Sequence, residues 1–156
     1  MVWPGDVPEV GASGRFVVVL DNSLSMGLVE GGESLLAKAR DRAVSMVEAL
    51  PEGTELALVR VSGEAVALQS SLETSRAAIV EGILSTEQGY GGTDLAGALH
   101  EARALLDGEP GEVLVFSDGV GPGVVEAAQS ELAWLLEASA SVIPILIRSD
   151  NPQNLT

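Results

Sequence analysis

The amino-acid sequence predicts an α/β fold in which helices cover one mostly parallel, five-stranded sheet. Short apolar, β-branched segments alternate with longer segments of helical periodicity, the pattern of a parallel sheet with crossover helices. Only Ser62-Gly63 separates two predicted strands, and so short a link demands an antiparallel hairpin. Pro144 lies inside the last predicted strand, and a residue without an N–H group is expected at the edge of a sheet.

The central strand is predicted at residues 16–20, because an unbroken apolar run suits a strand buried on both faces. It follows an irregular lead-in, 1–13, and ends abruptly at Asp21 in a serine-containing loop. Leu24 and Met26 in this loop either form an apolar rim or lie buried beneath it. Gly31-Gly32 then predicts an exposed turn.

The rest of the chain continues the alternation. Ser34 is expected to cap a helix that runs to about residue 50. Thr93-Asp94 opens another helix, to about residue 106, after a glycine-rich loop. The remaining predicted helices are 74–84 and 124–138, and the remaining predicted strands are 55–62, 64–70, 113–116 and 142–147.

Composition restricts the classes of partner. The 156 residues fit one domain with a sizeable core, which aliphatic side chains must fill because only 3% of residues are aromatic. The net charge of −15, from 23 acidic and 8 basic residues, argues against nucleic acid or anionic membranes as partners. No apolar run approaches the ~20 residues that span a bilayer, so we expect no membrane insertion by this segment.

Oxygen-bearing side chains follow two of the predicted buried strands. Asp21, Ser23 and Ser25 come directly after the first, and Asp118 follows the strand at 113–116. Thr93 begins its helix after Gly91-Gly92. The carboxyl ends of parallel strands lie on one rim of a sheet, where ligands bind at the point of strand-order reversal. Oxygen-only donors of this kind suit Mg²⁺, Mn²⁺ or Ca²⁺.

Each of these residues also has an ordinary structural explanation. Asp and Ser are common in strand-end turns, and Asp118-Gly119 reads as a turn as well. Either Thr93 or Asp94 is a suitable N-cap for the helix that follows. Coincidence becomes the poorer explanation when all of them occur together in these strand contexts.

Asp21-x-Ser23-x-Ser25, Thr93 after Gly91-Gly92, and Ser117-Asp118-Gly119 resemble the metal-ion-dependent adhesion site of von Willebrand factor A (vWA) domains. All five motif positions are filled. The resemblance implies a Rossmann-like three-layer fold with strand order 3-2-1-4-5, in a vWA domain over 14–149. It implies that Ser23, Ser25 and Thr93 bind the cation directly and that Asp21 and Asp118 act mostly through water.

The function implied by this resemblance is a non-enzymatic protein-binding module. Mg²⁺, or Mn²⁺ or Ca²⁺, would bind an Asp or Glu carboxylate of a partner protein. Bacterial membrane-anchored relatives of the aerotolerance type have similarly short loops, and some work with MoxR-type AAA+ ATPases. Family members commonly add a sixth strand and a C-terminal helix. The sequence predicts neither of them here, so we expect no helix-driven affinity switch in this chain. The polar tail, 150–156, is expected to lead to further domains.

Two alternatives remain open. One is a metal-independent vWA scaffold that binds through its sheet edge or a helix. The other is a Mg²⁺-dependent phosphohydrolase of the haloacid dehalogenase type, which needs a second Asp two residues after the first. Here that position is Ser23, and the only lysine, Lys38, falls within a predicted helix. We expect His100 at the surface and Trp134 at the edge of the core.

Overall fold

The computed structural model describes residues 14–69, 71–119, 126, 128–137 and 140–147. The predicted lead-in, 1–13, and the predicted tail, 150–156, lie outside this part of the chain. The domain limits of 14–149 therefore remain a prediction.

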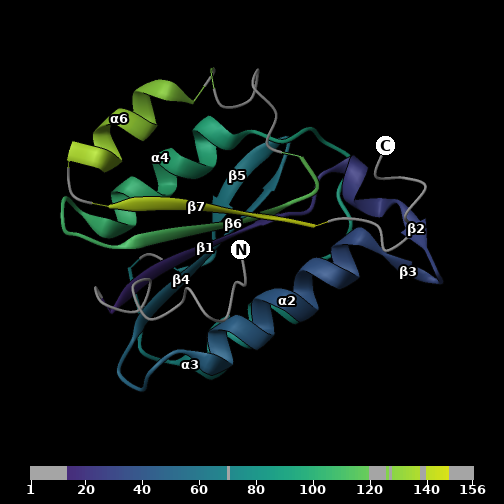
Figure 1. Ribbon diagram of the computed structural model, residues 1–156, viewed down its shortest axis with the longest axis horizontal. Coiled ribbons are helices and arrows are strands. Elements are labelled where there is room, and N and C mark those ends of the chain that lie inside the picture. Colours follow the sequence, from purple (N-terminus) through teal and green to yellow (C-terminus); the bar gives the residue numbers. More distant parts are fainter. Residues whose placement is uncertain (1–13, 70, 120–125, 127, 138–139, 148–156) are drawn as a thin grey trace.

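A single five-stranded sheet forms the middle of the molecule (Figure 1). Its central strand is β1 (Arg15–Asp21), which pairs in parallel with β4 (Glu55–Ser62) and β6 (Glu112–Ser117). At one edge, β5 (Glu64–Ala67) is antiparallel to β4; at the other, β7 (Ser141–Leu146) is parallel to β6. The order β5-β4-β1-β6-β7 confirms the predicted order 3-2-1-4-5 and its antiparallel edge hairpin.

Helices cover both faces of the sheet and give three layers. Figure 1 shows α2 (Leu35–Ala49) and α3 (Arg76–Leu84) on one face, with α4 (Leu95–Leu106) and α6 (Gln129–Glu137) on the other. This confirms the Rossmann-like α/β class. The predicted start of the last helix, at 124, lies outside the described residues.

The strand residues alternate between two apolar cores, one under each helical layer. Large side chains such as Phe16 and Leu20 face α2 and α3, whereas Val17 and Val19 face α4 and α6. Both faces of β1 are therefore covered, as expected for an unbroken apolar run. Its burial fixes the end of the strand, and with it the position of Asp21.

Two segments differ from the predictions. The exposed turn predicted at Gly31-Gly32 is present, but the residues beside it were not expected to pair: β2 (Val29–Glu30) and β3 (Glu33–Ser34) form a short hairpin. Gly31 and Gly32 form its turn, and both have positive φ (61° and 82°), which two-residue hairpin turns favour.

The strand β5 ends at Ala67 rather than at residue 70. The side chain of Gln69 explains the early end. Its Oε1 accepts a hydrogen bond of 2.8 Å from the backbone N–H of Leu58, a donor on β4. The side-chain amide thus satisfies a group that a longer ladder would have paired.

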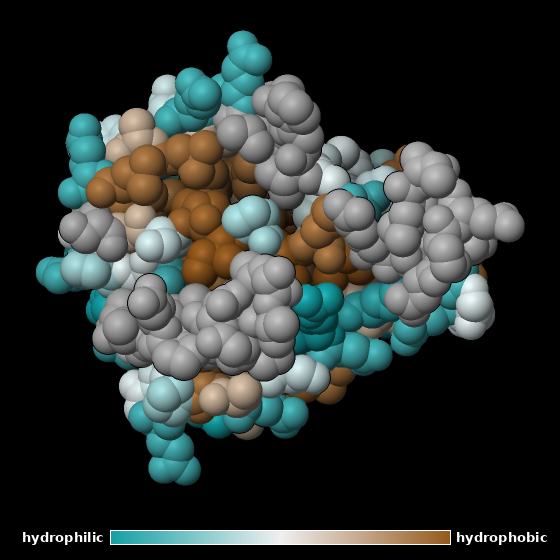
Figure 2. Space-filling model, in the orientation of Figure 1, coloured by the Kyte–Doolittle hydropathy of each residue, from teal (hydrophilic) through white to brown (hydrophobic). Residues whose placement is uncertain are grey.

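The β7 edge carries the predicted Pro144, which pairs with Val115 in the register of β6 and β7. Hydrophobic residues gather over this edge and near α6 in the view of Figure 2. Trp134 on α6 was expected at the edge of the core, and that expectation is wrong: it is 56% exposed, with Arg103 4.4 Å from its ring centroid. His100 is exposed, as predicted.

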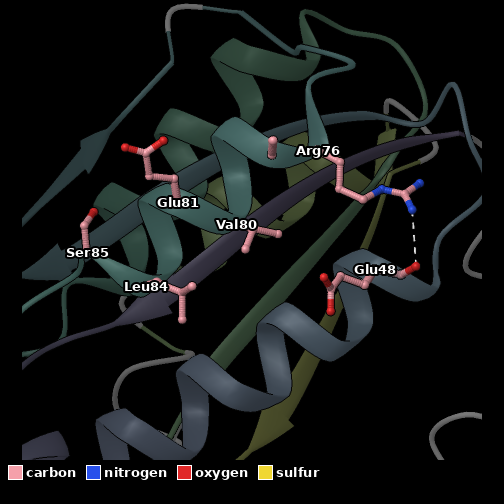
Figure 3. Close-up of a pocket in the computed structure, with 7 residues that line it drawn as sticks. Glu48, Arg76, Val80, Glu81, Leu84 and Ser85 are labelled. Carbon is pink, nitrogen blue, oxygen red and sulfur yellow. Dashed lines mark hydrogen bonds between the residues drawn. The ribbon is translucent and has the colours of Figure 1, made fainter.

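A shallow groove of about 800 Å³ lies where α3 meets the end of α2. Val80 and Leu84 point from α3 toward α2 (Figure 3). Arg76 closes one end of the groove by donating hydrogen bonds to the backbone carbonyls of Glu48, Leu50 and Pro51, at 3.2, 2.7 and 3.0 Å. These carbonyls belong to the C-terminal end of α2, where helical partners run out.

Candidate metal centre

The candidate site lies at the carboxyl ends of β1 and β6, the two neighbouring strands at which the strand order reverses. Asp21 is the last residue of β1, and Asp118 directly follows β6. The chain leaves β1 through the 3-10 helix η1 (Leu24–Gly27), whose Met26 is buried in the core under α2. This anchor turns the serine-containing loop back over the end of the sheet.

One hydrogen-bonded cluster joins the five residues predicted from the sequence. The carboxylate of Asp21 accepts from Thr93 Oγ1 at 3.0 Å, and Thr93 Oγ1 lies 3.1 Å from Ser23 Oγ. Ser23 Oγ is 3.4 Å from Ser25 Oγ, which donates to Asp118 Oδ1 at 3.0 Å. All five side chains therefore meet at this rim.

At the start of α4, the structure shows which of Thr93 and Asp94 caps the helix, a question that the sequence left open. Asp94, not Thr93, caps the helix: its Oδ1 accepts from the backbone N–H of Gly97 at 2.9 Å. The hydroxyl of Thr93 is thus not needed at the helix terminus, and it points into the cluster instead.

Two further residues hold the cluster in place. Ser117 donates from its hydroxyl to Asp21 Oδ2 at 2.6 Å. Gln88 donates from Nε2 to the backbone carbonyls of Ser23, Leu24 and Gly89, at 2.8, 3.3 and 2.7 Å. The motif contained Ser117 without assigning it a role, whereas no sequence pattern indicated Gln88.

The loop from Glu87 to Gly92 is attached to the serine loop along its length. Gly89 N donates to Asn22 O at 2.8 Å, and Asn22 Nδ2 donates to Glu87 O at 2.9 Å. Leu24 N donates to Gly91 O at 2.9 Å. These hydrogen bonds hold the loop that precedes Thr93 against the end of β1.

The carboxylate of Asp21 is almost completely buried, with 1% of the residue exposed. Besides the two hydroxyls it accepts the backbone N–H of Ser23 at 2.9 Å. Within the part of the chain that the structure describes, no basic side chain forms an ion pair with Asp21 or Asp118. Buried anions are normally neutralised by a positive partner, so this environment favours a cation.

The donor set fits a hard divalent cation. It consists of carboxylate and hydroxyl oxygens, the ligands that Mg²⁺, Mn²⁺ and Ca²⁺ prefer. Adjacent oxygens around an octahedral Mg²⁺ are roughly 3 Å apart, and the hydroxyl of Ser23 is 3.1 and 3.4 Å from the hydroxyls of Thr93 and Ser25. Among the described residues, no group of three or more His, Cys, Asp or Glu side chains could hold a metal.

The fold and this oxygen cluster define a class of protein: an α/β domain with a polar site at the strand-order reversal. The family model described as von Willebrand factor type A domain matches residues 16–120. The chain therefore belongs to the von Willebrand factor type A family.

Solved structures share the fold of this chain at low sequence identity. An aerotolerance-related membrane protein from Bacteroides fragilis is 20% identical, with a TM-score of 0.69 over 85% of this chain and 67% of its own. A von Willebrand factor type A protein from Catenulispora acidiphila is 19% identical, with a TM-score of 0.62 over 86% of this chain and 38% of its own. The manganese-loaded TRAP protein from Plasmodium vivax is 17% identical, with a TM-score of 0.69 over 90% of this chain and 59% of its own.

The chain thus spans less than two thirds of the Catenulispora and Plasmodium chains. No curated protein sequence matches it. Among its described helices, none combines the length and the apolar character needed to cross a membrane.

Proposed function

We propose that this vWA domain is a non-enzymatic protein-binding module that binds a divalent cation, Mg²⁺ or the similar Mn²⁺ or Ca²⁺, and through it a carboxylate of a partner protein. The observation that carries the proposal is the continuous cluster of Asp21, Ser23, Ser25, Thr93 and Asp118 around a buried carboxylate. The manganese in the similarly folded TRAP protein is in keeping with it.

In this proposal the hydroxyls of Ser23, Ser25 and Thr93 bind the cation directly, while Asp21 and Asp118 act mostly through water. Asp21 already accepts three hydrogen bonds, and at least one of them is on each of its oxygens, which favours an indirect role. The bound cation supplies positive charge that neutral ligands do not cancel, and it therefore attracts an incoming carboxylate.

The same burial argues against the phosphohydrolase alternative. A nucleophilic Asp must reach a phosphorus atom with one free carboxylate oxygen. Asp21 is 1% exposed, and both of its oxygens accept hydrogen bonds. We therefore propose no catalysis at this site.

The partner is a protein that presents an Asp or Glu. The structural likeness to an aerotolerance-related membrane protein supports testing a MoxR-type AAA+ ATPase as one candidate. The net charge of −15 favours a partner whose surface is not itself strongly acidic.

Calorimetric titration with Mg²⁺ and Mn²⁺ of the metal-stripped chain tests the site. We expect one-site binding by the wild type and a loss of about tenfold or more in affinity for Ser25→Ala, which removes one proposed ligand. Ser25 is exposed, so this change should leave the fold intact.

Ser45→Ala is the matched control, because Ser45 is also exposed but lies in the middle of α2. It should bind the cation as the wild type does. Equal affinity of Ser25→Ala and the wild type would refute the proposed ligand set. Absence of binding by the wild type would favour the metal-independent scaffold.

A further inference from the structure

Large apolar side chains are exposed in the two chain segments that also carry the proposed ligands Ser23, Ser25 and Thr93. Isolated exposed apolar residues are ordinary on a protein surface, but a group of them at one place marks an interaction site. Three follow Ser23 within six positions, and the fourth lies on the loop that precedes Thr93. Two of them, Leu24 and Tyr90, come from segments that hydrogen bonds join, and we call this pair the apolar rim.

Hydrogen bonds hold the two loops of the apolar rim side by side. Leu24 N donates to Gly91 O at 2.9 Å, and Gln88 Nε2 bonds Leu24 O at 3.3 Å. Tyr90 lies between Gln88 and Gly91 on this second loop and is 84% exposed. Leu24 and Tyr90 therefore come from backbone segments in direct contact.

Leu24 has no role in the core that would explain an apolar residue at this position. The sequence left open whether Leu24 and Met26 form a rim or lie buried under the loop. Met26 is fully buried and anchors η1, whereas Leu24 is 60% exposed. Leu24 also lies between two proposed ligands, Ser23 and Ser25.

We propose that the apolar rim binds apolar side chains that flank the partner's metal-binding carboxylate. The ligand is then a protein segment with one Asp or Glu next to large apolar residues. This inference rests on the proposed function. Consecutive Cα atoms are about 3.8 Å apart, so side chains next to a carboxylate bound beside Ser23 and Ser25 come within reach of Leu24, which lies between these two serines in the sequence.

Charge distinguishes this ligand from an acidic peptide. The chain carries 23 acidic and 8 basic residues, and a bound divalent cation offsets only two of its negative charges. A run of several carboxylates would be repelled by the remaining field. A single carboxylate with apolar neighbours gains the attraction of the cation and the contact with the rim.

Peptide selection tests the proposal. The Mg²⁺-loaded full chain selects from a phage-displayed library of random peptides, with the Asp21→Asn variant as the background. We expect enriched peptides to carry Asp or Glu next to Leu, Ile, Phe or Trp. Their affinities, measured by fluorescence anisotropy of the synthetic peptides, should fall about tenfold or more in Leu24→Ser and Tyr90→Ser.

Leu136→Ser is the matched control, because Leu136 is 67% exposed on α6 and should not affect binding. Calorimetry should give all three variants the Mg²⁺ affinity of the wild type. Mg²⁺-dependent peptides without apolar neighbours, or an unchanged affinity of Leu24→Ser and Tyr90→Ser, would overturn the rim but keep the proposed function. Absence of Mg²⁺ binding by the wild type would overturn both the apolar rim and the proposed function. Failure to enrich any peptide over the Asp21→Asn background would also contradict the rim.

Discussion

At the scale of single residues, Thr93 and Asp94 have separate roles at the start of one helix. Asp94 satisfies an N–H group of α4, and Thr93 directs its hydroxyl to Asp21 and Ser23. Had Thr93 been the cap, its oxygen would have been committed to the helix, and the cluster would have lacked a donor. The pair is therefore necessary for the proposed ligand set.

Gln88 is expected to position the serine loop without binding the cation. Its amide donates to three carbonyls, two of which belong to Ser23 and Leu24. We expect Gln88→Ala to weaken Mg²⁺ binding by about three- to tenfold, the equivalent of one net hydrogen bond. Calorimetric titration measures this loss.

Gln129→Ala is a suitable control, because Gln129 is exposed at the start of α6. An affinity for Mg²⁺ that is the same in Gln88→Ala and Gln129→Ala would show that the serine loop keeps its shape without the amide.

The residues of the cluster were largely predictable from the sequence, but Gln88, which holds the serine loop in place, was not. Asp21, Ser23 and Ser25 have a fixed spacing at the end of an apolar run, which makes them visible. Gln88 acts on backbone carbonyls of a distant loop, and such contacts leave no trace in composition or periodicity. The exposure of Trp134 was also missed, because an apolar side chain on a helix does not reveal which way it faces.

At the scale of elements, the close approach of two loops depends on a glycine. A Cβ atom at Gly91 would overlap the backbone of Gly63, whereas at Gly92 it would meet nothing within 4 Å. We therefore expect Gly91→Ala to displace the loop that carries Thr93, lowering both the thermal midpoint and the affinity for Mg²⁺. Differential scanning calorimetry with and without Mg²⁺ measures both effects.

Gly92→Ala serves as the paired control, since its added methyl group has free space. It should behave nearly as the wild type. If both variants have the same thermal midpoint, the contact between these loops does not constrain the site.

Arg76 joins α3 to the end of α2 through three carbonyl oxygens. Its positive charge also lies at the negative end of the helix dipole of α2. We expect Arg76→Ala to lower the free energy of unfolding by about 1–3 kcal/mol. Urea denaturation measures the change, and Arg42→Ala, an exposed position within α2, should have a much smaller effect.

Strand order was more predictable than element limits. The short link predicted at Ser62-Gly63 and the proline in β7 are strict constraints, because one forbids a crossover and the other removes a donor. The early end of β5 depends on where the side chain of Gln69 reaches. The hairpin of β2 and β3 has two-residue strands, too short to show a periodicity.

At the scale of the whole molecule, the net charge of −15 opposes the compact state. We expect the metal-free protein to unfold at a higher temperature in about 0.15 M salt than in 0.01 M, because the screening length shortens from about 30 to about 8 Å. Thermal unfolding followed by circular dichroism in EDTA checks this. A midpoint that is constant or falls with salt would mean that the acidic residues are too far apart to repel.

The hydrogen bonds of the cluster join residues that are 70, 72, 93 and 96 positions apart in the sequence. In a chain without cysteine, the proposed cation would thus act as a cross-link between three distant segments. A covalent bridge that closes a loop of this length stabilises a protein by about 4–5 kcal/mol on chain-entropy arguments. A cation at this junction would give part of that benefit reversibly, so a chelator would do to this domain what a reducing agent does to a disulfide-bonded one.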